Sequence, residues 1–340
     1  SSTHHHKDFG GDEVLFYAYT TRGKRKREAK ITEIVARKRE RFVGTLQKRN
    51  GTRFVRVSPR ISTSDFYIES EPEMKTADGD RVLISFTSWE ETKSPQAKII
   101  EVLGVPGDAE TEIHTILAEY GLPYVFDPQI EQEANKIDEK ISPEEIKKRM
   151  DYRDVLTFTI DPTDAKDFDD ALSFQEKENG DFEVGIHIAD VSHYVKPGTV
   201  LDDEAYQRAT SVYLVDRVVP MLPEQLSNKV CSLRPNEEKL TFAAIFTLDT
   251  QGNVKDQKFG RTVINSNYRF AYHEAQHIIE TGASTIPTAL SLTSQTYSVD
   301  EKVKGAILQL NTTAKYMRKK RMQSGAISFD KEEVRFSLDE

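Results

Sequence analysis

The segment TIDPTDAKDFDDA, residues 159–171, places five aspartates among the ten positions from Asp161 to Asp170. It continues the apolar run VLTFTI (155–160), which predicts a buried β-strand. Carboxylates within a few ångströms of one another repel, so a cluster of them either holds protons through raised pKa values or is neutralised by a cation. The sequence therefore predicts a cation site at the end of a buried strand.

Magnesium fits this cluster, because Mg²⁺ prefers oxygen ligands and commonly sits on one or two carboxylates plus substrate phosphates. If the chain turns after Asp161 and enters a new strand near Asp169, four carboxylates converge: Asp161, Asp167, Asp169 and Asp170. Two such ions about 4 Å apart can orient an attacking water and stabilise the leaving oxygen of a phosphodiester. A structural cation site and a solvated acidic turn remain as alternatives, whereas an EF-hand loop does not fit the spacing.

The region before this segment predicts an all-β fold between residues 12 and 103. Turn signals such as Asn50-Gly51 separate seven apolar-rich stretches, at 14–18, 31–36, 41–47, 53–57, 65–68, 81–86 and 98–103. The last five suit a small five-stranded barrel of the OB type. The first two resemble the end of a preceding, incomplete barrel, and the run TRGKRKR (21–27) between them is strongly basic.

Helical spacing follows at 109–120 and 130–150, where Ser142-Pro143-Glu144-Glu145 predicts a helix start. From residue 154 the pattern is mixed. We expect strands at 154–160, 170–176, 181–189, 240–249 and 256–269, and helices near 199–210, 271–280 and 300–323.

A series of short segments closely resembles the RNB domain of the RNase II/RNase R exoribonucleases, with a pattern nearer to the RNase R branch. The segments are IDPTDAKDFDDA (160–171), IADVSHYV (188–195), TSVY (210–213), VPMLP (219–223), LSN (226–228), CSL (231–233) and GAISF (325–329). The resemblance implies an all-β OB-type cold-shock barrel followed by the N-terminal half of an α+β RNB catalytic domain. Its expected domains are the end of a first cold-shock barrel (1–40), a second one (41–104), a helical linker (105–150) and the catalytic domain (151–340).

The resemblance also implies an activity: processive, Mg²⁺-dependent hydrolysis of single-stranded RNA from its 3′ end to nucleoside 5′-monophosphates. Asp161, Asp167, Asp169 and Asp170 match the magnesium-site aspartates, with Asp169 tied most tightly to catalysis, while Asp164 falls outside the four. Three aromatic residues match RNA-contacting positions. Tyr213 is expected to hold the 3′-terminal nucleotide, Phe329 to close the other end of the stacked bases, and Tyr272 to lie near the RNA path.

A catalytic arginine and a basic S1 barrel, which the family has farther along, do not occur in the sequence, so we expect a truncated chain. The competing hypothesis is an RNA-binding module without catalysis. A third hypothesis is a zinc hydrolase, because HEAQH (273–277) has the H-E-x-x-H pattern of zinc proteases. It lacks that pattern's usual continuation, and histidines on the surface of a helix are the ordinary explanation.

Charge is distributed unevenly along the 340 residues, whose formal net charge is −9. Residues 1–60 hold 16 basic and 6 acidic side chains, which leaves 31 basic and 50 acidic ones in the rest. A basic arm joined to an acidic body suits a protein that binds a polyanion with one part and cations with the other. With a single cysteine, no apolar run of membrane-spanning length and no secretory signal, the sequence predicts a cytoplasmic protein with no membrane contact. Single-stranded RNA is the partner that the resemblance implies.

Overall fold

The structure is a computed structural model that describes residues 7–20, 27–69, 75–90, 93–215 and 217–328. The chain divides into two compact units, Ser1–Tyr124 and Val125–Glu340, and each has a hydrophobic core of its own. Across the described residues, no helix combines the length and the apolar character needed to cross a membrane.

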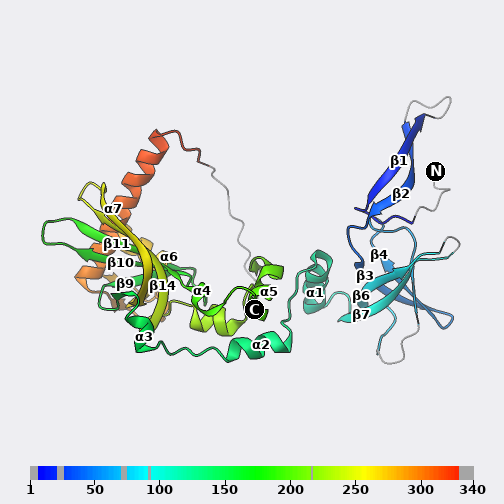
Figure 1. The fold of residues 1–340 in the computed structure, drawn as a ribbon, viewed down its shortest axis with the longest axis horizontal. Coiled ribbons are helices and arrows are strands. Elements are labelled where there is room, and N and C mark those ends of the chain that lie inside the picture. The colour runs from blue at the N-terminus through cyan, green and yellow to red at the C-terminus, as the bar shows by residue number, and fades with distance from the viewer. Residues whose placement is uncertain (1–6, 21–26, 70–74, 91–92, 216, 329–340) are drawn as a thin grey trace. The chain divides into compact units, whose positions relative to one another are not determined.

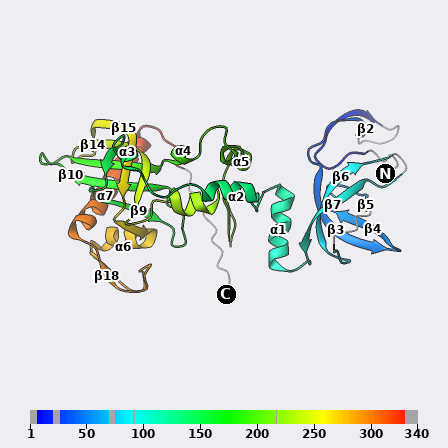
Figure 2. The same cartoon turned by 60° about the horizontal axis from the view of Figure 1, so that its bottom comes forward.

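Five strands of the first unit close into a barrel in the order β3-β4-β5-β7-β6 (Figure 2). The strands are β3 (Arg41–Arg49), β4 (Thr52–Val57), β5 (Phe66–Ile68), β6 (Arg81–Ser88) and β7 (Gln96–Gly104). Their side chains alternate as expected for a half-buried strand: in β4, Val55 and Val57 are buried while Arg56 is exposed. The predicted five-stranded barrel of the OB type is confirmed.

Two further strands precede the barrel, β1 (Glu13–Thr20) and β2 (Arg27–Ala36), and form an antiparallel two-stranded sheet. The aromatic side chains of β1 are exposed, and the rings of Tyr17 and Tyr19 stack with centroids 6.1 Å apart. The stretch 21–26 of the basic run lies outside the described residues. That these strands end a first barrel stays a prediction.

The segment expected as a helical linker (105–150) is divided between the two units, since the first unit ends at Tyr124. Helix α1 (Ala109–Tyr120) contacts the barrel strands, whereas α2 (Pro128–Asn135) packs against α5 (Val200–Arg208) of the second unit. The prediction of one continuous helix at 130–150 is wrong beyond Asn135, where α2 ends. A short helix α3 (Pro143–Ile146) starts after the predicted cap Ser142, because a proline disfavours helical backbone in the residue before it.

A seven-stranded mixed sheet forms the centre of the second unit, in the order β16-β9-β10-β11-β14-β15-β8 (Figure 1). The strands are β8 (Met150–Tyr152), β9 (Thr157–Asp161), β10 (Asp170–Glu176), β11 (Phe182–Ala189), β14 (Glu238–Leu248), β15 (Val254–Asn265) and β16 (Tyr268–Ala271). The outermost pairs, β16 with β9 and β15 with β8, are parallel, and all the others are antiparallel.

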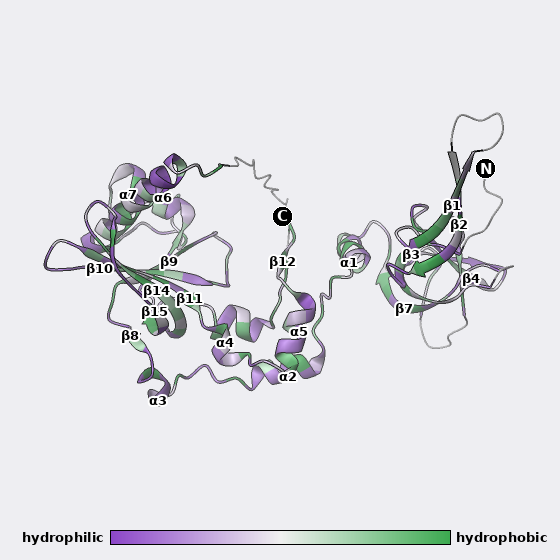
Figure 3. Cartoon of the chain, turned by 45° about the horizontal axis from the view of Figure 1, so that its top comes forward, coloured by the Kyte–Doolittle hydropathy of each residue, from purple (hydrophilic) through white to green (hydrophobic). Residues whose placement is uncertain are grey.

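Helices cover both faces of this sheet. The helices α6 (Tyr272–Thr281) and α7 (Glu301–Gln323) pack over Phe158, Phe174 and Phe270. The other face carries α2, α5 and the π-helix η1 (Gln225–Val230), which cover Ala171 and Ala189. Both colours of the hydropathy scale run along α2 and α5 in Figure 3, as expected for helices with one face in a core. The smaller elements are α4 (Val191–Tyr194), β12 (Val212–Tyr213), β13 (Val218–Val219), β17 (Thr285–Ile286) and β18 (Tyr297–Ser298).

The strand expected at 256–269 is two strands, and the break between them shapes the site. The strand β15 ends at Asn265, and β16 then crosses to the opposite edge of the sheet to pair with β9. Asn267 fixes the crossing, because its side-chain oxygen accepts from Thr157 N at 2.9 Å and its own N–H donates to Thr157 O at 2.7 Å. The crossing brings β16 alongside the strand that ends in Asp161.

Candidate functional site

The acidic segment connects two neighbouring strands of the sheet, as the sequence predicts. The first, β9, ends at Asp161, and β10 begins at Asp170. Between them the backbone turns at 162–165, where Ala165 N donates to Pro162 O at 3.2 Å. All five aspartates line one pocket of about 690 Å³, within the size range of ligand sites.

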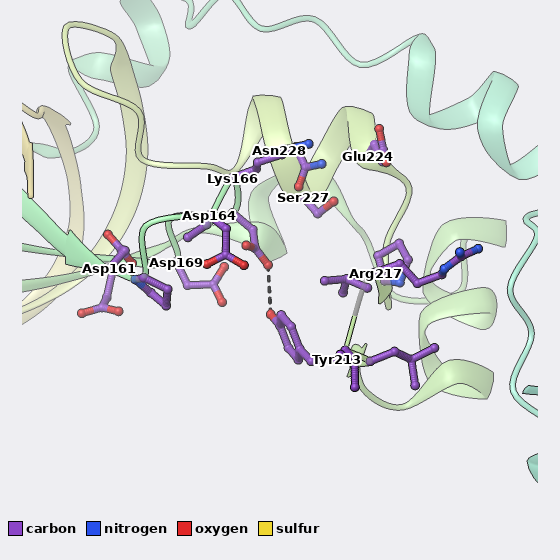
Figure 4. Close-up of a pocket in the computed structure, with 17 residues that line it drawn as sticks. Asp161, Asp164, Lys166, Asp169, Tyr213, Arg217, Glu224, Ser227 and Asn228 are labelled. Atoms are coloured by element: carbon purple, nitrogen blue, oxygen red, sulfur yellow. Dashed lines mark hydrogen bonds between the residues drawn. The ribbon is translucent and has the colours of Figure 1, made fainter. Parts of the chain in front are cut away.

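The pocket combines the acidic loop with η1 and the β12–β13 hairpin (Figure 4). Asp161 and Asp169 lie at one end in Figure 4, and Arg217 and Glu224 at the other. Six carboxylates and two cations, Lys166 and Arg217, stand among the described lining residues. The pocket is therefore strongly negative.

Burial, followed by repulsion between carboxylates, raises the pKa of two aspartates in this cluster. Burial raises the pKa of Asp161 above its usual range, and the charges of Asp170 and Asp167 raise it further. The pKa of Asp169 is raised by burial and by the same two neighbours. The Oδ2 atom of Asp161 is buried and has no hydrogen-bond partner. A buried carboxylate oxygen without a partner is costly, so these residues call for a cation.

Divalent metal fits these donors, because hard cations prefer carboxylate oxygens. Over the described part of the chain, no three acidic, histidine or cysteine side chains are placed so that they could hold a metal ion by themselves. Mg²⁺ does not need such a group, since it retains several waters and binds through one or two carboxylates and substrate phosphates. The four matched aspartates and the orphaned Asp161 oxygen suit that open mode of binding.

Asp164 differs from the other four aspartates. It lies within the 162–165 turn and lines the pocket, and it is exposed, as Asp169 and Asp170 also are. Unlike Asp167 and Asp170, it does not contribute to the raised pKa of Asp161 or Asp169. Its position makes it a useful control for the other aspartates.

Tyr213 faces the acidic loop from strand β12 (Figure 4). Its hydroxyl donates to Asp167 Oδ2 at 3.0 Å while 65% of the residue remains exposed. Burial, followed by the bond to Asp167, raises the pKa of Tyr213 to about 12, so the hydroxyl keeps its proton. An exposed ring fixed beside carboxylates can stack on a base while the adjoining phosphate lies at the cluster.

We expect Tyr213→Ala to weaken binding of single-stranded RNA about tenfold, because a base–aromatic stack contributes about 1–3 kcal/mol. Tyr213→Phe removes only the hydroxyl and is expected to weaken binding less than about threefold. Fluorescence anisotropy with a labelled oligoribonucleotide measures both, in an Asp169→Asn background that keeps the RNA intact. Equal losses for Phe and Ala would assign the effect to the hydroxyl instead.

The structure describes only one of the other two aromatic residues that match RNA-contacting positions. Tyr272 is 53% exposed and begins α6, directly after Ala271, which pairs with Asp161 across β16 and β9. It is thus close in the fold to the acidic cluster although it does not line the pocket. Phe329 lies outside the described residues.

The H-E-x-x-H segment has structural roles in this fold. His273 Nε2 donates to Leu290 O at 2.8 Å and His277 Nε2 to Thr285 O at 3.2 Å. Glu274 is buried and accepts from Ala271 N, Leu292 N and the hydroxyl of Tyr297. One nitrogen of each histidine ring binds a backbone carbonyl and the glutamate holds the helix start, so the segment forms no zinc site among the described residues.

Several lining residues were not predicted as site residues from the sequence: Lys166, Arg217, Glu224, Ser227 and Asn228. Ser227 and Asn228 belong to a segment that resembles the family, so that segment was the available signal. The π-helical form of η1, which presents them to the pocket, has no signature in the spacing of the sequence.

Comparison with known proteins identifies the family. The RNB domain model matches residues 149–340, and the cold shock domain model matches residues 54–127. The chain belongs to the RNB domain family, and the expected barrel-plus-RNB architecture is confirmed.

The relatives of the chain include bacterial ribonucleases R. It is 35% identical over 341 residues to Ribonuclease R 2 of Lactococcus lactis, covering 97% of this chain and 50% of the relative. It is 35% identical over 338 residues to Ribonuclease R of Aquifex aeolicus, covering 98% and 46%. The chain thus spans about half the length of these relatives.

Solved structures agree. Mycoplasma genitalium RNase R in complex with ribose-methylated single-stranded RNA superposes with a TM-score of 0.81 at 26% identity, covering 98% of this chain and 51% of that one. The RNase R of the same organism has also been solved in complex with double-stranded RNA, and it superposes with a TM-score of 0.80.

Proposed function

We propose that this chain carries the aspartate centre of a Mg²⁺-dependent exoribonuclease. The enzyme degrades single-stranded RNA processively from the 3′ end and releases nucleoside 5′-monophosphates. The observation that carries the proposal is the charge of the pocket, where six carboxylates meet two cations. A phosphodiester cannot approach such a surface unless bound cations reverse its sign, which is the arrangement of metal-dependent phosphodiester hydrolysis.

Asp161, Asp167, Asp169 and Asp170 are the residues that would hold the metal. Bound Mg²⁺ supplies charge neutralisation and polarises the phosphate oxygens. The protein fixes the carboxylates in place, because Asp161 ends a strand in the middle of the fold and Asp170 begins the next one. The hydroxyl of Tyr213 holds Asp167, and its ring offers a platform for the terminal base.

RNA binding away from the pocket is assigned to the barrel. Phe54 and Tyr67 pair across strands β4 and β5 with ring centroids 6.0 Å apart, and Tyr67 is 38% exposed. Arg56, on the same strand as Phe54, is exposed beside them and pairs with Asp65 at 3.3 Å. Aromatic rings among cations bind single-stranded nucleic acid without regard to sequence.

Polarity and products provide the test. A 5′-labelled oligoribonucleotide in excess is incubated with the chain and Mg²⁺, with EDTA as control, and the released mononucleotides are identified by liquid chromatography. The proposal predicts that the label passes from the full-length RNA to a short 5′ end product without accumulating at intermediate lengths, and that nucleoside 5′-monophosphates are released. RNA that is bound but left intact would instead support a silent RNA-binding module.

A further inference from the structure

The loop between Asp161 and Asp170 has little regular backbone pairing of its own, although it carries most of the site's carboxylates. Within it, the described backbone bonds are the 162–165 turn and the contacts of Phe168 and Asp169. The spacing of the carboxylates must therefore be set by side chains that reach the loop from elsewhere.

Arg269 is the first of these side chains. It lies in β16, where it is paired with Thr159 of β9, and its Nη2 donates to three backbone carbonyls of the loop. The acceptors are Thr163 O at 2.7 Å, Ala165 O at 3.2 Å and Pro162 O at 3.3 Å. One guanidinium nitrogen thus bonds three carbonyls of the turn.

The same guanidinium contacts the returning arm of the loop. Its Cζ lies 4.8 Å from the centroid of the Phe168 ring, a residue that is 5% exposed and belongs to the core next to α2 and η1. Phe168 stands between Asp167 and Asp169 in the chain. Arg269 therefore joins both arms of the loop, and its positive charge also acts on Asp161.

Ser232 holds the loop from the opposite side. Its hydroxyl donates to Lys166 O at 2.9 Å and accepts from Phe168 N at 3.0 Å, while Leu233 N donates to Phe168 O at 2.8 Å. Ser232 is 1% exposed, so these bonds are shielded from water. This is the physical role of the Cys231-Ser232-Leu233 segment.

We propose that Arg269 and Ser232 are positioning residues that set the spacing of the four aspartates and thereby the affinity of the site for divalent metal. Both bond the loop and neither lines the pocket. The inference rests on the proposed metal-dependent function. A residue that acts through metal ligands typically changes metal affinity 10–100-fold when it is removed.

Four variants of the chain test this: Arg269→Ala, Arg269→Lys, Ser232→Ala and, as a control, Arg318→Ala at an exposed position of α7. Mn²⁺ binding is followed by electron paramagnetic resonance of the free ion, and thermal unfolding is recorded in parallel. We expect Arg269→Ala to weaken Mn²⁺ binding at least about tenfold while the protein remains folded. Arg269→Lys keeps the positive charge but not the planar guanidinium group, and it is expected to weaken Mn²⁺ binding about threefold.

Unchanged Mn²⁺ affinity in folded Arg269→Ala and Ser232→Ala would overturn the inference and leave the proposed function standing. If Arg269→Ala fails to fold, Arg269→Lys and Ser232→Ala decide the matter by the same criterion. A wild-type chain that binds no Mn²⁺ would instead contradict the metal centre itself. A comparable loss in Arg318→Ala would show that the effect is not specific to the loop.

Discussion

Replacing Asp169 by asparagine is expected to lower kcat for RNA hydrolysis about a thousandfold while RNA binding changes less than about threefold. The substitution removes one negative charge from the cluster without changing its shape, so it acts on the metal-dependent step. Charge stabilisation by a correctly held metal contributes several kcal/mol, and about 4 kcal/mol corresponds to this factor. Single-turnover hydrolysis and anisotropy measure the two quantities.

Asp164→Asn is the matched control, because it makes the same chemical change in the same loop and pocket. Asp164 is exposed, as Asp169 is, but unlike Asp167 and Asp170 it is not among the charges that raise the pKa of Asp161 or Asp169. We expect its kcat to stay within about threefold of wild type. Similar losses in both variants would mean that total pocket charge, and not the four-aspartate centre, governs the reaction.

The second large effect concerns stability. The side chain of Arg149 is fully buried and forms ion pairs with Asp190 at 2.8 Å and with Glu145 at 2.9 Å. Asp190 is also buried, directly after strand β11. Burial alone would raise the pKa of Asp190, but Ser192 and Arg149 hold it below its usual range, so the carboxylate remains ionised at neutral pH.

We expect Arg149→Ala to lower the free energy of unfolding by about 3–5 kcal/mol, because it removes the buried cation beside the buried Asp190. Asp190 then keeps only Ser192 and the half-exposed Arg261 at 3.4 Å, and the partly buried Glu145 also loses its pair.

Arg153→Ala is the control. Arg153 pairs with Asp151 and Glu238, but its side chain is 32% exposed, so its loss is expected to cost less than about 1 kcal/mol. Urea unfolding followed by circular dichroism compares the variants, and equal midpoints would contradict the assigned role of Arg149.

Much of the fold was predictable because its elements have local signatures. The barrel strands alternate buried and exposed residues, and helix α1 covers the predicted 109–120. The errors fall where tertiary contacts override the local pattern. The crossing between β15 and β16 depends on Asn267 meeting Thr157, which is 110 positions away in the chain.

The site, like the fold, has parts that the sequence predicts and parts that depend on tertiary contacts. Five aspartates in one segment are enough to predict a cation site from the sequence. The family resemblance adds Tyr213, whose hydroxyl bonds Asp167 in the structure. The contacts of Arg269 could not be predicted, because its three acceptors are backbone carbonyls more than a hundred residues earlier. Backbone acceptors carry no side-chain identity, so no residue pattern marks them.

Crystals of the chain grown with Mn²⁺ and a short oligoribonucleotide test the central claim most directly, through anomalous scattering from the metal. The predicted result is an anomalous peak in the pocket, about 2.0–2.2 Å from at least one carboxylate oxygen of Asp161, Asp167, Asp169 or Asp170, with an RNA phosphate beside it. An empty pocket at saturating Mn²⁺, or RNA bound with no metal among the aspartates, would contradict the assignment of this cluster as a metal-dependent ribonuclease centre.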